Sequence, residues 1–230
     1  MIGQREDYPT RRTILTSAGA SALLLALPGC AGVGGPLSME EAIRRLLLLS
    51  AENAFARLTM PGGYWDEQIA RAGLGNMLGA RGDVLTRILT SALVKSRLEE
   101  EFARVAVDAS FRAAPIVTDA VRLIGIRNAV DLVRGGPSAA STFLRGEVGD
   151  RLLDAMVPGL GEGLRIARDP VLSEAVRALT GVDTRAAATR LGQTIDNAIW
   201  DEIGREEAAI RANPRATRDP LLIGVFGLGQ

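Results

Sequence analysis

Residues 189–227 have the sequence TRLGQTIDNAIWDEIGREEAAIRANPRATRDPLLIGVFG, and this stretch decides the fold class. Its large aliphatic residues recur at intervals of four or seven and share one stripe of a helical wheel: Leu191, Ile195, Ile199, Ile203 and Ile210. Ala198 and Trp200 widen this stripe. Charged residues fall on the opposite, polar face: Asp196, Asp201, Glu202, Arg205, Glu206 and Arg211. The pattern predicts an amphipathic helix whose apolar face packs into an all-α domain.

The end of this helix and the tail behind it are also marked in the sequence. Glu207 and Arg211 stand four residues apart with the acid first, which is the favourable order for an ion pair along a helix. Pro214 ends the helix, because the residue before a proline is pushed out of the α region. Polar residues 215–219 then permit a reversal, so we expect the apolar run 220–227 to fold back onto the body.

Several short motifs occur here at a characteristic spacing. Residues 206–214 are EEAAIRANP, Leu221-Leu222 follows, and Val225-Phe226-Gly227 closes the run. Together they resemble the end of a family known as domain of unknown function family 4197, whose members are bacterial envelope proteins with no assigned activity. Residues 139–145, AASTFLR, resemble the central Ala-Ala-Thr motif of that family with its following aromatic residue and arginine. The resemblance extends over most of the chain after about Ser38.

The chain departs from that family in one long predicted helix. Residues 107–111 are VDASF where the family tends to carry Asn-Arg-Ala-Ala-Glu, so a role that rests on that asparagine or glutamate is not expected here. The residues that we single out as an interaction or structural motif are Trp200, Glu206, Glu207, Arg211, Asn213 and Phe226.

The composition indicates a globular, α-rich protein. Of the 230 residues, 47% are hydrophobic and only 4% aromatic, and the chain is long enough to bury a core. The 27 basic residues balance the 27 acidic ones, so no bulk charge favours nucleic acid as a partner. The absence of histidine excludes Ser-His-Asp and Cys-His nucleophilic systems, and the single cysteine excludes cysteine-cluster metal sites. We expect no catalytic residue, metal site or cofactor.

The first 29 residues are typical of an export signal. Arg11 and Arg12 precede two apolar residues, as in the twin-arginine motif, although adjacent arginines also occur in ordinary secretory signals. The apolar run 17–27 is shorter than the ~20 residues that span a bilayer. It leads into Leu27-Pro28-Gly29-Cys30, which resembles a lipobox, although a lone cysteine is also often a small buried hydrophobe.

These features predict the organisation of the chain. Residues 1–29 are a cleaved signal peptide, residues 30–37 a flexible tether, and residues 38–230 a single helical domain, a bundle of about seven to nine helices. Cys30 becomes the lipidated first residue, which makes the membrane one partner, and an envelope protein is a second. We expect the protein in the cell envelope, lipid-anchored on the periplasmic side, at the outer membrane.

Within the body, Ser38 and Glu41 form a capping box that predicts a helix start. Tyr64 and Trp65 are expected to plug the edge of the core rather than to line a pocket. Pro115 is expected to kink or restart its helix. The sequence also predicts a helix stop at Pro61-Gly62-Gly63, a helix cap at Asp83 and a break at Pro158-Gly159. Further helices are predicted over residues 66–72, 97–114, 116–123, 126–133, 138–156, 160–167 and 171–179, and from Thr184 onward.

Three functions remain open from the sequence. The first is a non-catalytic, lipid-tethered module that binds another envelope component, and it rests on the export signal and the missing nucleophile motifs. The second is a carrier of a lipid or another hydrophobic ligand, because several helices are rich in leucine and alanine, although core packing explains these residues as well. The third is a hydrolytic enzyme that uses carboxylates, with candidates in the last helix: Asp201, Glu202, Glu206 and Glu207. Since Glu202 and Glu206 are predicted on a solvated face, we favour the binding module.

Overall fold

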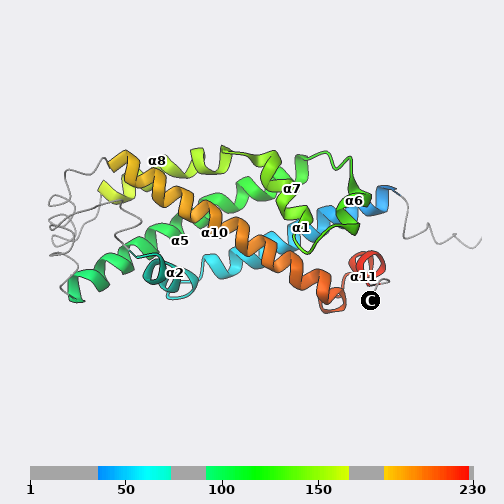
Figure 1. Cartoon of the computed structure of the whole chain (residues 1–230), viewed down its shortest axis with the longest axis horizontal. Coiled ribbons are helices and arrows are strands. Elements are labelled where there is room, and N and C mark those ends of the chain that lie inside the picture. The colour runs from blue at the N-terminus through cyan, green and yellow to red at the C-terminus, as the bar shows by residue number, and fades with distance from the viewer. Residues whose placement is uncertain (1–35, 74–91, 166–183, 228–230) are drawn as a thin grey trace, which may run out of the picture. The chain divides into compact units, whose positions relative to one another are not determined.

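The computed structural model describes residues 36–73, 92–165 and 184–227 (Figure 1). Contacts within the chain divide it into two units, Met1–Gly32 and Val33–Gln230, and every described residue lies in the second unit. Arg11, Arg12 and Cys30 therefore lie outside the described residues. The same is true of the predicted cap at Asp83 and of the helix predicted over residues 171–179.

The described residues confirm the predicted all-α fold class. They form eight α-helices and one 3₁₀-helix, with no β-strand among them: α1 (Pro36–Leu58), α2 (Tyr64–Ala72), α5 (Ala92–Leu123), α6 (Ala129–Arg134), α7 (Ala139–Val148), α8 (Arg151–Arg165), α10 (Thr184–Ala212), η1 (Pro214–Thr217) and α11 (Pro220–Phe226). None of these helices combines the length and the apolar character that a membrane crossing requires.

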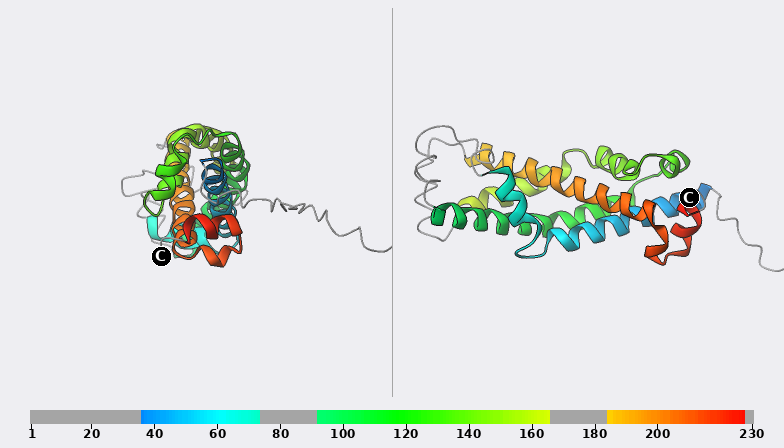
Figure 2. Two further views of the ribbon diagram at one scale, coloured as in Figure 1. Left: turned by 90° about the vertical axis from the view of Figure 1, so that its right-hand side faces the viewer. Right: turned by 60° about the horizontal axis from the view of Figure 1, so that its bottom comes forward.

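Four helices form the centre of the fold. α1, α10, α8 and α5 pack in a closed ring, in which each helix contacts the next and α5 contacts α1 again (Figures 1 and 2). The short helices cover this bundle from outside: α2 packs on α5, α6 and α11 pack on α1, and α7 packs on α10. Each long helix thereby buries its apolar face against two neighbours, as expected for amphipathic helices that have no sheet to pack against.

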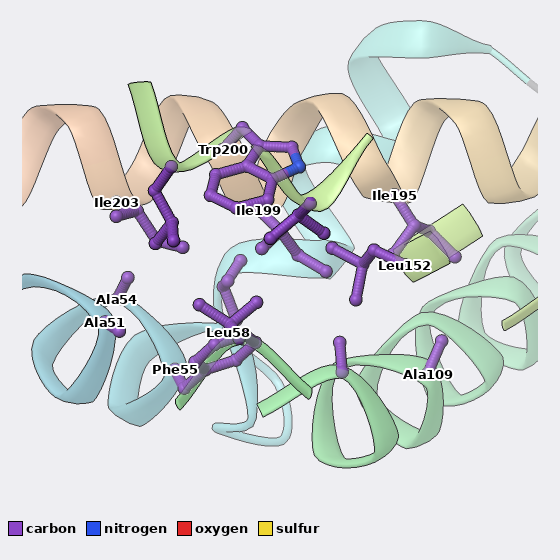
Figure 3. Close-up of a cluster of buried hydrophobic side chains, with 14 of the residues drawn as sticks. Ala51, Ala54, Phe55, Leu58, Ala109, Leu152, Ile195, Ile199, Trp200 and Ile203 are labelled. Carbon is purple, nitrogen blue, oxygen red and sulfur yellow. The ribbon is translucent and has the colours of Figure 1, made fainter. Parts of the chain in front are cut away.

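The predicted apolar stripe of α10 lies in the core. All five of its large aliphatic residues are buried, from Leu191 to Ile210, and Trp200 is buried beside them. Figure 3 shows Ile199 pointing from α10 toward Leu58 of α1, and Ile195 pointing into the core on the side of Leu152 of α8. Burial of one such aliphatic side chain contributes ~1.5–3 kcal/mol, so this stripe is a main source of the stability of the bundle.

Small residues let the helices approach closely, which explains a core with few aromatic rings. α5 buries a row of alanines, among them Ala103, Ala106, Ala109 and Ala113. In α10, Gly192 lies so close to α8 that a Cβ atom there would come within 2.8 Å of Leu153 Cδ1. Helix contacts of this kind leave little room for a larger side chain.

Trp65 packs into the core, as predicted. It is fully buried, and its indole Nε1 donates a hydrogen bond to Ser110 Oγ at 3.1 Å. Ser110 in turn donates to the carbonyl of Ala106 at 2.9 Å, so the polar end of the indole is satisfied inside α5. Tyr64 is half-buried and meets the Trp65 ring edge-on, with 5.2 Å between the ring centroids.

The start of α1 differs from the prediction. The helix begins at Pro36, so Ser38 lies within its first turn and is not the N-cap of a capping box. Proline is favoured at the first helical positions, because its missing N–H group would have no partner inside the helix there. The stop at Pro61-Gly62-Gly63 is confirmed, since α1 ends at Leu58 and α2 starts at Tyr64.

Two prolines lie inside helices: Pro115, which was predicted to kink or restart its helix, and Pro158, where a break was predicted. α5 is one continuous helix through Pro115, and α8 continues through Pro158. The break falls instead at Gly149 between α7 and α8, where φ is 55°, in the left-handed region that favours glycine. An interior proline costs ~3 kcal/mol, and the packing of α5 and α8 within the ring offsets this cost.

Candidate functional site

The tail folds back onto the body, as predicted. α10 ends at Ala212, and Pro214 starts the short helix η1. Asp219 then caps α11, because its Oδ1 accepts hydrogen bonds from the backbone amides of Leu221 and Leu222 at 2.8 and 3.2 Å. Leu222 is almost completely buried, and α11 packs against α1. The tail is therefore part of the core and not a free peptide.

Asp219 also ties the tail to α1 through its side chain. Its Oδ2 accepts a hydrogen bond from Arg45 Nη1 at 2.8 Å. Partial burial pushes the pKa of the Asp219 carboxyl upward, but the hydrogen bonds from Arg45, Leu222 and Leu221 outweigh burial and lower this pKa below its ordinary value. The charged form thus stabilises the fold above the ordinary aspartate pKa, and this contribution is lost as the pH falls through the lowered value.

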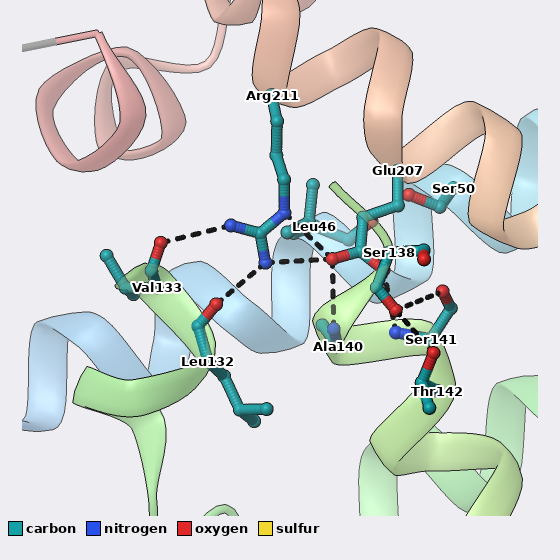
Figure 4. Close-up of polar contacts among 10 residues, drawn as sticks. All are labelled: Leu46, Ser50, Leu132, Val133, Ser138, Ala140, Ser141, Thr142, Glu207 and Arg211. Atoms are coloured by element: carbon teal, nitrogen blue, oxygen red, sulfur yellow. Dashed lines mark hydrogen bonds and ion pairs between the residues drawn. The ribbon is translucent and has the colours of Figure 1, made fainter. Parts of the chain in front are cut away.

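Glu207 is a fully buried carboxylate between α10 and the start of α7 (Figure 4). Its two oxygens accept hydrogen bonds from the backbone amides of Ala140 and Ser141, at 3.0 and 2.6 Å. These amides belong to the first turn of α7, where N–H groups have no partner inside the helix. Ser138, at the N-cap position, makes no capping hydrogen bond with its side chain. A residue of α10 therefore caps α7 in place of the local serine.

Arg211 extends this contact to α6. Its Nε donates to Glu207 Oε1 at 2.8 Å, which confirms the predicted pair four residues apart. Its Nη1 and Nη2 donate to the carbonyls of Val133 and Leu132, at 3.1 and 2.9 Å (Figure 4). The Glu207–Arg211 bracket, as we call these two side chains, thereby holds α6, α7 and α10 together. Phe226 of α11 lies against it, with the guanidinium 4.8 Å from the ring centroid.

Glu202 is the main correction to the predicted polar face. Its side chain is fully buried, whereas the helical wheel placed it in solvent. It forms ion pairs with Arg57 of α1, at 3.1 Å, and with Arg205, while neither of its oxygens has a well-aligned hydrogen bond within the described part of the chain. Burial raises the pKa of Glu202, and the charges of Arg205 and Arg57 offset only part of this effect.

Glu206 lies nearer to the surface and shares Arg57 with Glu202. Its Oε1 lies 3.3 Å from Arg57 Nη1, and its Oε2 accepts a hydrogen bond from Asn53 Nδ2 at 3.3 Å. This carboxylate therefore joins α10 to α1 and does not belong to the Glu207–Arg211 bracket. Asn213, also singled out from the sequence, is the N-cap of η1 but makes no capping hydrogen bond with its side chain.

Asp196 is a second carboxylate that the helical wheel misplaced. It is buried beside Trp200, whose indole Nε1 donates to Asp196 Oδ1 at 3.1 Å. Arg145 of α7 pairs with the other carboxylate oxygen at 3.1 Å. Burial raises the pKa of Asp196, and the charge of Arg145 and the hydrogen bond from Trp200 offset only part of the increase. Trp200 and Asp196 thus have a structural role between α7 and α10.

A groove of about 390 Å³ runs between α7 and α10. Ser141 and Thr142 line it from α7, and Asp201 and Ala208 line it from α10. Gly204 brings the two walls together, since a Cβ atom there would lie 3.4 Å from both Ser138 Cβ and Ser141 Oγ. We call this feature the α7–α10 groove.

Two arginines on opposite walls of the α7–α10 groove are each anchored by a buried carboxylate. Arg145 is held by Asp196 and Arg205 by Glu202, and both arginines line the groove. Their side chains remain 39% and 50% exposed, so the anchored guanidinium groups still face solvent. A guanidinium has five donors in a fixed fork and binds carboxylates with good geometry. This arrangement is suited to a polar ligand that carries an acidic group.

The sequence did not predict this groove. Its two anchors, Asp196 and Glu202, were assigned to solvent, and no pattern in the sequence shows that α7 packs alongside α10. The one available signal was the AASTFLR motif of residues 139–145, which includes Arg145. Within the ranges that the structure describes, no cluster of three or more acidic, cysteine or histidine side chains is placed to hold a metal ion.

The chain matches the family described as "Protein of unknown function (DUF4197)" over residues 35–227. Because this match covers most of the chain, the chain belongs to that family, and the resemblance seen in residues 139–145 and 206–227 is confirmed. No curated protein and no solved structure matches the chain.

Proposed function

We propose that this member of the DUF4197 family is a non-catalytic binding module of the cell envelope, tethered to the membrane by a lipid on Cys30. One observation supports this proposal above the others. The buried acidic residues of α10 serve the fold, since Glu207 caps α7 while Asp196 and Glu202 anchor arginines. The α7–α10 groove, in contrast, presents those anchored arginines to solvent.

The proposed occupant of the groove is a polar segment of an envelope protein that carries an acidic side chain. Arginine is enriched among the residues that dominate binding energy at interfaces. Arg145 and Arg205 are already held by Asp196 and Glu202, so they lose less conformational entropy on binding than free side chains do. Stable interfaces bury ~1,200–2,000 Å², so a groove of about 390 Å³ holds the anchoring residues of a larger contact.

One specific observation favours the alternative of a carboxylate-based hydrolase. Burial raises the pKa of Glu202, and a raised carboxyl pKa is what a general acid requires near neutral pH. The carboxylate is, however, fully buried between Arg57 and Arg205, and it is not among the residues that line the α7–α10 groove. Binding is therefore better supported than hydrolysis.

The alternative of a hydrophobic carrier has less support. A carrier encloses its ligand in a mostly apolar cavity. The α7–α10 groove has charged and hydroxyl-bearing walls, and the described side chains between the four long helices pack together as a hydrophobic core.

The tether is tested separately from the groove. Metabolic labelling with an acyl probe should mark the wild-type chain and not Cys30→Ser, and equal labelling of both would overturn the lipid anchor. For the export route, changing Arg11 and Arg12 together to lysine should leave precursor in the cytoplasm. Normal export of that variant would assign the signal to the general secretory route.

Binding at the groove is tested by photo-cross-linking in the native envelope. A photoreactive residue at Asp201, which is exposed and lines the groove, should give one discrete protein adduct. The same probe at Glu67 of α2, a position that is 76% exposed and lies outside the groove, is the control. Adducts at both positions or at neither would overturn the proposal.

A further inference from the structure

The chain enters the described fold at Pro36, and a defined set of elements surrounds this point. Arg44, in the first half of α1, donates a hydrogen bond to the carbonyl of Val121 at 3.0 Å, which places the end of α5 beside it. α6 and α11 pack on α1 as well, and Arg45 binds the cap of α11. Figure 1 shows α6 and α11 near the blue start of α1. The surface around the start of α1 is therefore built from the end of α5, from α6 and from the tail.

We call this surface the entry face and define it by six exposed residues: Leu123, Arg127, Val130, Arg134, Arg215 and Arg218. Its four arginines have no ion-pair partner within the described parts of the chain. The acidic residues near them are fewer or already occupied: Asp131 is exposed, Asp119 pairs with Arg122 at 3.4 Å, Glu40 pairs with Arg44, and Glu41 and Asp219 pair with Arg45. The face thus has a local excess of positive charge in a chain whose formal net charge is zero.

Two apolar side chains lie among these arginines. Leu123, at the end of α5, is 85% exposed, and Val130 of α6 is 37% exposed. Beside Leu123 is a hollow of about 500 Å³ that Ile116 and Ile124 also line, together with the charged side chains of Asp119, Glu147 and Arg151. Arginines combined with exposed apolar residues are typical of surfaces that lie in the headgroup region of a bilayer.

We propose that the entry face lies on the anionic phospholipid headgroups of the membrane to which the chain is tethered. This inference rests on the proposed lipid anchor at Cys30. From Cys30 to Pro36 the chain advances by six residues and reaches at most about 20 Å, so the entry face is the part of the fold nearest to the lipid. Anionic lipid attracts arginines near its surface, and each of them strengthens binding by roughly fivefold. The opposite end of α1 is then left accessible to a partner.

The test uses the chain from residue 30 with Cys30→Ser, because all contacts described above lie within residues 36–227. Cysteine is introduced by Leu123→Cys and labelled with an environment-sensitive fluorophore. Vesicles of phosphatidylglycerol and phosphatidylcholine should shift its emission to the blue, and pure phosphatidylcholine should not. The matched control is Met60→Cys, which is 58% exposed and follows the end of α1 at Leu58, about 21 Å along the helix from Arg44, the residue beside the end of α5.

Charge reversal supplies the second readout. Arg127→Glu with Arg134→Glu should weaken binding to the anionic vesicles at least roughly twentyfold, at about fivefold for each arginine. Arg71→Glu with Arg104→Glu, two exposed arginines away from the entry face, should change it by less than about twofold.

The inference is overturned if the emission shifts equally for the labels at Leu123 and Met60. It is also overturned if the Leu123 label shifts on pure phosphatidylcholine, or if it shifts on neither kind of vesicle. A blue shift of the Leu123 label that grows with protein concentration in the absence of vesicles also overturns it, because a second copy of the chain would then cover the entry face. Acyl labelling of Cys30 does not depend on the entry face. A chain that is acylated but shows no vesicle-dependent shift therefore refutes this inference and leaves the proposed tether standing.

Discussion

Glu207→Gln should destabilise the protein strongly although it preserves the shape of the side chain. In the native chain, the carboxylate accepts hydrogen bonds from the amides of Ala140 and Ser141 and pairs with Arg211 at 2.8 Å. In the variant, the glutamine side chain has an NH₂ group in place of one carboxylate oxygen, and this group faces N–H donors of the protein instead of accepting from them. The substitution also removes the carboxylate that pairs with Arg211, whose side chain is only 10% exposed.

The expected loss follows from this burial. Removal of one partner of a buried ion pair costs ~3–5 kcal/mol, out of a total of ~5–15 kcal/mol for a domain. In a domain of this size, each 1 kcal/mol corresponds to roughly 2–4 °C in Tm. The Tm of Glu207→Gln should therefore lie roughly 6–20 °C below that of the wild type.

Thermal unfolding followed by circular dichroism measures this difference, and the chain offers a matched control. Glu67→Gln removes an ion pair with Arg71 of the same 2.8 Å length, but with side chains that are 76% and 66% exposed. Such surface pairs contribute ~0–1 kcal/mol, so this variant should melt within about 4 °C of the wild type. Adding Arg211→Met to Glu207→Gln should recover part of the loss, because the buried charge that paired with Glu207 is then removed as well. Equal melting of Glu207→Gln and Glu67→Gln would refute the structural role of the bracket.

Three further changes test other parts of the fold. Leu222→Ala should lower the free energy of unfolding in urea by ~2–5 kcal/mol, and Phe226→Ala should lower it by less, because Leu222 is almost completely buried and Phe226 only partly. A larger loss in Phe226→Ala than in Leu222→Ala would contradict the packing of the tail. Glu202→Gln should gain stability relative to the wild type as the pH rises above the ordinary glutamate pKa, because the wild-type native state still holds a proton that the unfolded chain has lost, and this gain should level off once the pH passes the raised native pKa. Urea titrations at several pH values measure it, and a stability difference between the two proteins that does not change with pH would be inconsistent with it. Gly192→Val should lower the free energy of unfolding by ~1–3 kcal/mol, because its Cβ atom would lie 2.8 Å from a side-chain atom of α8. The control Gly146→Ala, whose Cβ atom would have nothing within 4 Å, should leave the melting temperature unchanged or raise it. Similar melting temperatures for the two variants would argue against the close contact.

The features that local sequence determines were predicted correctly. The stripe from Leu191 to Ile210 repeats with the period of a helix, and one buried face is enough to explain it. The pair of Glu207 and Arg211 needs only the geometry of one helical turn. The return of the tail follows from Pro214 and from an apolar run that water would not solvate well.

The features that depend on distant partners were not predicted. Glu202 and Asp196 were assigned to solvent because a helical wheel treats every charge as solvated. Arg57 and Arg145 pair with these carboxylates, and they come from helices that lie far away in the sequence. The same limit applies to the cap of α7, which Glu207 provides from another helix while Ser138 does not.

The tail shows the same limit on a smaller scale. The apolar run 220–227 was expected to fold back, but its sequence does not show which of its residues is buried most. In the structure, Leu222 is the residue of α11 that is buried, while Phe226 lies beside the Arg211 guanidinium. The turn made by η1 and the cap at Asp219 decide which face of α11 meets α1, and the sequence does not specify that rotation.

Two neighbouring alanines of α10 provide the most direct test of the α7–α10 groove as a binding site. Ala208 lines the groove, whereas Ala209 is exposed and lies outside it. Ala208→Trp should fill the groove, and Ala209→Trp should not, while both variants keep the melting temperature of the wild type. With the photoreactive probe at Asp201, the yield of the partner adduct should fall at least tenfold, roughly 1.4 kcal/mol, in Ala208→Trp and stay unchanged in Ala209→Trp. An adduct that persists in Ala208→Trp, or one that disappears equally in both variants, would contradict the proposed function.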